Sequence, residues 1–91
     1  MGEASREVTI VNKRGLHARA SAKFVAAVAA MERCAVRVAK DGHSAAGDSI
    51  LGLMMLGAAK GDAVEVTVRG EGAEARLAEL VALVEGGFGE D

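Results

Sequence analysis

The chain has 91 residues, of which 51% are hydrophobic and 26% charged, and its formal net charge is −2. These values fit a single domain, residues 1–91, built on one apolar core, and they exclude a disordered chain. The negative charge and a 2% aromatic content argue against nucleic-acid binding, and no apolar run approaches the roughly 20 residues of a membrane-spanning helix.

The first half of the chain predicts a strand, a helix and a second strand. Residues 8–11 are β-rich, with Val8 and Ile10 on one face. Over residues 18–31 apolar side chains recur at three- and four-residue spacing, which is typical of an amphipathic helix. Residues 34–39 alternate as a strand does. The start of the chain lacks a signal-peptide pattern and the one cysteine can form no internal disulfide, so we expect a cytoplasmic protein.

The second half predicts a hairpin return, a short helix, a strand and a last helix. The Asp41-Gly42 pair is a hairpin signal that leads into a weak strand over 43–47. Ser49 can cap a short helix that ends near residue 56. Alternation over 64–68 and helical spacing from 73 complete the order β-α-β-β-α-β-α, after which Phe88 is expected to fold back onto the core. This order predicts an α+β fold with four strands and the helices layered on one side.

The stretch Gly15-Leu16-His17-Ala18-Arg19 places a histidine and an arginine at the start of the first predicted helix. The first N–H groups of a helix lack partners and its dipole favours negative charge, so this position suits an anion. A neutral imidazole is a nucleophile, and a guanidinium offers donors to phosphate oxygens. The sequence therefore predicts a site that accepts, holds and releases a phosphoryl group. By spacing alone, a histidine at the position of His17 is more often a capping or surface residue, and Arg19 could equally well be a solvated helix residue.

The histidine motif, the later block Gly47-Asp48-Ser49-Ile50-Leu51-Gly52-Leu53-Met54 and the order of elements together resemble the histidine-containing phosphocarrier protein (HPr) family. The resemblance runs from about residue 6 to the end, and residues 87–91 are similar to the nitrogen-related (NPr) branch. It implies an open-faced β-sandwich: a four-stranded antiparallel sheet covered on one face by three helices.

The same resemblance implies a role in the bacterial phosphoenolpyruvate-dependent phosphotransferase system. His17 would take a phosphoryl group from phospho-enzyme I, with Arg19 as its partner, and pass it to a histidine of an enzyme IIA protein. Ser49 matches the serine that an HPr kinase/phosphorylase modifies in many members. Ala20 stands where the family usually has proline; alanine is an excellent helix former, so we expect the helix to persist.

Apolar residues after Ser49 predict a docking surface for partner proteins. Ile50, Leu51 and Met54 are too many apolar groups for a short helix to bury on one side, and we assign Ala20 beside the histidine to the same surface. A phosphate on Ser49 would add about −1.5 to −2 charge. That charge would oppose docking of an acidic enzyme I surface.

Two functions from different classes fit these observations. One is a stoichiometric phosphocarrier, not an enzyme, that acts without cofactor or metal and is expected to be monomeric. The alternative is a non-catalytic regulatory module of the same fold that acts by protein docking. His17 discriminates between them, because a purely regulatory module has no reason to keep a histidine at the helix start.

Overall fold

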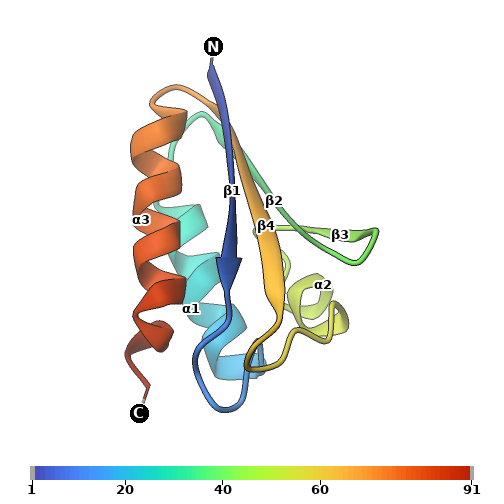
Figure 1. Ribbon diagram of the computed structural model, residues 1–91. Coiled ribbons are helices and arrows are strands. Elements are labelled where there is room, and N and C mark those ends of the chain that lie inside the picture. Colours follow the sequence, from blue (N-terminus) through green and yellow to red (C-terminus); the bar gives the residue numbers. More distant parts are fainter. Residues whose placement is uncertain (1, 91) are drawn as a thin grey trace.

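Four strands form one antiparallel sheet, and the helices cover one of its faces (Figure 1). The protein is described by a computed structural model over residues 2–90. The strands are β1 (Gly2–Thr9), β2 (Cys34–Lys40), β3 (His43–Ala46) and β4 (Ala63–Gly70), in the spatial order β1-β4-β2-β3. The helices are α1 (Ala18–Ala29), α2 (Ile50–Met55), α3 (Ala73–Glu85) and the short 3₁₀ helix η1 (Gly87–Gly89). The predicted open-faced α+β sandwich is confirmed.

The core lies between the helices and the covered face of the sheet. Along β4, Val66 and Val68 are fully buried, whereas Glu65 and Arg69 are exposed on the open face. Successive strand side chains point to opposite faces, so this alternation makes one face apolar and the other polar. From the helix layer, Phe24 of α1 fills the same core and is 2% exposed.

Strand β1 is longer than the sequence predicted. The prediction placed a strand at 8–11, but β1 begins at Gly2, which lies opposite Gly70 of β4, and it ends at Thr9. Backbone pairing requires no apolar alternation, so the first half of the strand carries no sequence signal. Ile10 lies just beyond the strand and is 1% exposed, so its predicted place in the core is confirmed.

The remaining predicted helices and strands match the observed ones to within two residues at each end. The hairpin between β2 and β3 turns at Asp41 and Gly42, whose φ angles are +50° and +81°. Two positive φ angles are what a tight hairpin turn of the predicted kind requires. Within residues 2–90, no helix has the length and apolar character needed to cross a membrane.

Candidate functional site

The loop between β1 and α1 sets the position of the histidine. Gly15 has a φ of +60°, and a Cβ there would lie 2.2 Å from the carbonyl oxygen of Ala58. The next amide, of Leu16, donates to that same carbonyl at 3.0 Å, and the hydroxyl of buried Ser21 donates to the Leu16 carbonyl at 3.1 Å. Only glycine allows this close approach of two backbone segments. The residue after the loop is thereby held at the start of α1.

His17 is the N-cap of α1, as the sequence placed it. Its Nδ1 accepts a hydrogen bond from the backbone N–H of Arg19 at 3.3 Å, and its carbonyl accepts one from Ser21 N at 2.9 Å. The side chain is 15% exposed, so the ring is accessible without being free in solvent. A nitrogen that accepts a hydrogen bond carries a lone pair, so Nδ1 is the unprotonated nitrogen of the neutral ring.

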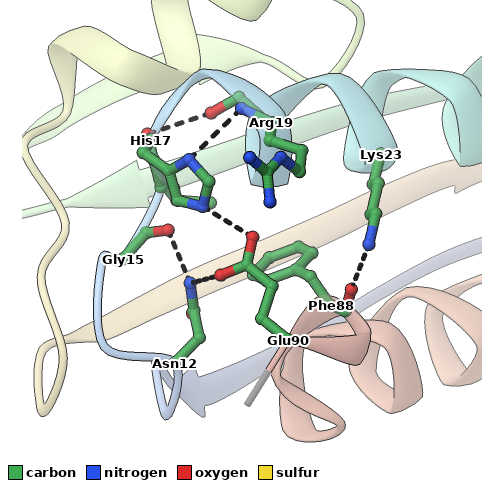
Figure 2. A network of polar contacts seen from close by, with 9 residues as sticks. Asn12, Gly15, His17, Arg19, Lys23, Phe88 and Glu90 are labelled. Atoms are coloured by element: carbon green, nitrogen blue, oxygen red, sulfur yellow. Dashed lines mark hydrogen bonds and ion pairs between the residues drawn. The ribbon is translucent and has the colours of Figure 1, made fainter.

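The other ring nitrogen contacts a residue from the end of the chain. Nε2 of His17 lies 2.6 Å from Oε2 of Glu90, and Oε1 of Glu90 accepts from Nδ2 of Asn12 at 3.0 Å (Figure 2). Nδ2 of Asn12 also donates to the Gly15 carbonyl at 2.8 Å. An ionised carboxylate only accepts hydrogen bonds, so Nε2 carries the proton and donates it. Both nitrogens of His17 are therefore fixed in role by their partners.

Glu90 is a carboxylate in this setting. Burial favours its neutral form, but the hydrogen bonds from Asn12 and His17, with the nearby positive charge of Lys23, outweigh that effect. Together they lower the pKa of the Glu90 carboxyl below its ordinary value. A negative charge therefore stays beside the imidazole at neutral pH.

The tail that carries Glu90 is anchored one turn before it. Phe88 is 1% exposed, which confirms its predicted return to the core. Its carbonyl accepts from Nζ of Lys23 on α1 at 2.6 Å (Figure 2). These two contacts hold the tail against α1 and present Glu90 to His17.

Basic side chains surround the exposed edge of the imidazole. They belong to the lining of an open pocket of about 380 Å³. Its lining residues are Lys13, Arg14, His17, Arg19, Lys23, Gly89 and Glu90. The guanidinium of Arg19 extends beside the ring (Figure 2), so the predicted pair is brought together. Four cations at a helix start form an environment that favours a phosphoryl group.

Ser49 lies on a different helix, outside that pocket. It is the N-cap of α2, and its Oγ accepts from the N–H of Gly52 at 2.9 Å, as the capping prediction requires. The predicted exposure of the apolar residues after it is also confirmed, with Ile50, Leu51 and Met54 exposed by 42%, 68% and 41%. Met55, at 77%, extends the patch. We name Ile50, Leu51, Met54 and Met55 the α2 patch.

The assignment of Ala20 to a docking surface is wrong. Its side chain is 0% exposed. Ala20, Phe24 and Val28 are spaced by four residues, so they share the inward face of α1, and all three are buried. Ala20 packs in the core beneath the start of α1, where a partner protein cannot contact it.

Sequence reasoning missed Asn12 and Glu90. Glu90 lies 73 positions from the histidine it contacts, and no local pattern reports a contact of that range. The available signal was the expected return of Phe88, since a residue two positions later must then come near the core as well. Asn12 is a polar residue directly after an apolar run, and it is 3% exposed.

Comparisons with known proteins agree with this geometry. A family profile described as "PTS HPr component phosphorylation site" matches residues 4–86. The phosphocarrier protein HPr of Pseudomonas aeruginosa is 46% identical over 85 residues, which cover 92% of this chain and 93% of that protein. The phosphocarrier protein NPr of Shewanella violacea is 37% identical over 90 residues, covering 99% and 98%. A crystal structure of HPr from Bacillus anthracis matches with a TM-score of 0.85 at 31% identity, over 92% of this chain and 99% of that one.

The fold and these matches define a class of protein: small phosphocarriers, which hand a phosphoryl group from one protein to another instead of turning over a substrate. The chain belongs to the HPr family of the phosphotransferase system, as its motifs indicated. Relatives of both names, HPr and NPr, match it over almost the whole length.

Proposed function

We propose that His17 is the residue that carries the phosphoryl group, received from phospho-enzyme I and passed to a histidine of an enzyme IIA protein. The observation that supports this most directly is the Nδ1 lone pair of His17, held at the start of α1 and surrounded by basic side chains. Such a site offers both a nucleophile and an anion receptor. We place this carrier in the cytoplasm, where it works as a monomer.

In the proposed transfer, the Nδ1 lone pair attacks phosphorus while the bond from phosphorus to the donor's histidine nitrogen breaks. Catalysis of such an in-line displacement rests mainly on positioning and on stabilising charge. The backbone N–H of Arg19, which now donates to Nδ1, is placed to donate to a phosphoryl oxygen, and the Arg19 guanidinium neutralises the new charge. Onward transfer reverses these steps, with the electron pair returning to Nδ1.

The direct test is incubation with phosphoenolpyruvate and enzyme I, followed by intact-mass measurement. The wild-type protein should gain one acid-labile phosphoryl group, and His17→Ala should gain none. His43→Ala is the matched control, because His43 is the second histidine and lies exposed on β3. Absence of an adduct on the wild type, or its persistence in His17→Ala, would favour the regulatory docking module instead.

We further propose that phosphorylation of Ser49 by an HPr kinase/phosphorylase reduces docking to enzyme I. Ser49 directly precedes the α2 patch, whose members Leu51 and Met55 are the most exposed large apolar residues described. A phosphate there would place negative charge at the edge of an apolar docking surface. An acidic partner would then meet repulsion and a desolvation cost.

A further inference from the structure

We propose that Glu90 is a positioning residue for phosphoryl transfer: its carboxylate keeps the proton of His17 on Nε2 and balances the charge that the ring gains when Nδ1 takes the phosphoryl group. This inference rests on the proposed function of His17. It assigns a role to a contact between residues that lie 73 positions apart in the sequence.

The first part of the argument is the tautomer. Neutral imidazole can carry its proton on either nitrogen, and only the unprotonated nitrogen can attack. Glu90 accepts from Nε2 at 2.6 Å, a short charge-assisted contact, whereas the contact from Arg19 N to Nδ1 is long at 3.3 Å. The stronger contact therefore sets the tautomer, and the weaker one leaves Nδ1 ready to exchange its partner for phosphorus.

The second part is the charge balance of the step. When Nδ1 of the neutral ring forms a bond to phosphorus, no proton is lost, so the ring becomes a phosphoimidazolium with its proton still on Nε2. The positive charge thus develops next to the Glu90 carboxylate, which stabilises it. A carboxylate that orients a histidine and stabilises its cationic form does the same in hydrolase triads.

The third part is that Glu90 is itself held in place. Its Oε1 accepts from Nδ2 of Asn12, a side chain that is 3% exposed. The same Nδ2 donates to the Gly15 carbonyl, so a flipped amide would set its oxygen against two acceptors. The buried anchor Phe88 fixes the tail just before Glu90. A rigid support of this kind is what a positioning residue needs.

Onward transfer depends on the same proton. A phosphoimidazolium leaves as a neutral imidazole, whereas a deprotonated phosphoimidazole would have to leave as an anion, which is far less favourable. By stabilising the protonated form, Glu90 extends the pH range over which the phosphoryl group leaves readily. Removing its charge should therefore lengthen the lifetime of phospho-His17 at neutral pH.

The test compares Glu90→Gln with Glu85→Gln, an exposed carboxylate at the end of α3 whose replacement changes the net charge equally. Glutamine retains a hydrogen-bonding side chain of the same size but not the charge. We expect Glu90→Gln to accept the phosphoryl group about tenfold more slowly, because a hydrogen bond to a charged group is replaced by a neutral one. Its isolated phospho-form should become resistant to hydrolysis at a lower pH than that of the wild type or Glu85→Gln.

Imidazole ¹⁵N chemical shifts report which nitrogen of His17 carries the proton, and they would not change if Glu90 only stabilised the fold. The wild type should show the proton on Nε2 of His17, and Glu90→Ala should show a mixture of tautomers. Wild-type transfer rates and an unchanged hydrolysis profile in Glu90→Gln would overturn the inference. That result is distinct from failure of the proposed function, in which His17 of the wild type would gain no phosphoryl group at all.

Discussion

At the residue scale, His17 combines two tasks that can be separated by mutation. It caps α1 through Nδ1 and, in the proposed function, it is the nucleophile. Asparagine is among the best N-cap residues but is no phosphoryl acceptor. We expect His17→Asn to exceed His17→Ala in unfolding free energy by about 1 kcal/mol, measured by urea denaturation, while neither accepts a phosphoryl group. Equal stabilities would mean that the long contact from Arg19 N contributes nothing to the cap.

Gly15 gives a second residue-scale prediction, because both its positive φ angle and the lack of space beside it disfavour any residue that has a Cβ. Gly15→Ala combines a φ of +60° with a Cβ 2.2 Å from the Ala58 carbonyl oxygen. Gly57→Ala is the matched control, since Gly57 has a φ of +65° but no atom within 4 Å of its Cβ. Backbone strain alone costs about 1–2 kcal/mol. The unfolding free energy should therefore fall clearly more in Gly15→Ala than in Gly57→Ala. Because the loop would shift, Gly15→Ala should also accept the phosphoryl group more slowly. Equal losses of unfolding free energy would contradict the clash with the Ala58 carbonyl.

The lowered pKa of Glu90 predicts a dependence of stability on acid. A carboxyl whose pKa is lower in the folded state contributes stability above its ordinary pKa of about 4.3, and this contribution is lost as the pH falls through the folded value. The wild type should therefore be more stable than Glu90→Gln near pH 6, and the difference should shrink as the pH falls below the ordinary carboxyl pKa and through the lower folded value. Thermal unfolding across this range measures it. A difference that persisted in acid would assign the stabilisation to packing instead of charge.

At the element scale, the sequence could predict those helices and strands whose apolar residues recur with a regular period. Alternation places β4, and four-residue spacing places α1, because each pattern follows from the geometry of its own element. The first half of β1 is set by pairing with β4 and the contact from Glu90 to His17 by the path of the tail, so neither has a local signature. Ala20 shows the converse error: the motif placed it beside His17, but the helical period points its side chain inward.

The capping of α2 separates the structural and regulatory roles of Ser49. Aspartate caps a helix as well as serine does, whereas alanine does not. Ser49→Ala should therefore lower the unfolding free energy by about 1 kcal/mol yet accept the phosphoryl group at the normal rate. Ser49→Asp should keep the stability but slow acceptance from phospho-enzyme I, because it adds charge beside the α2 patch. Equal acceptance rates in the two variants would contradict the proposed regulation.

At the scale of the whole molecule, the elements that carry the proposed site and the α2 patch lie at one end of the fold. The loop from β1 to α1, the tail after α3 and the short helix α2 lie at the same end of the sheet (Figure 1). Helices α1 and α2 also pack against each other. We therefore expect one partner to contact His17 and the α2 patch together. On the proposed function, a partner that docks on the patch would reach His17 without any change in the fold.

Because the α2 patch lies outside the pocket around His17, a mutation in the patch should affect docking without affecting phosphoryl transfer itself. Leu51 is 68% exposed, so Leu51→Glu should leave the thermal unfolding midpoint unchanged while it weakens docking. We expect acceptance from phospho-enzyme I to fall about tenfold at low enzyme concentration, as for a central interface residue. Ala78→Glu, on the exposed side of α3, adds the same charge away from the patch and should have no effect. Raising the concentration of enzyme I should restore the rate of Leu51→Glu, because only affinity is lost; a rate that stayed low at saturation would place Leu51 in the transfer step itself.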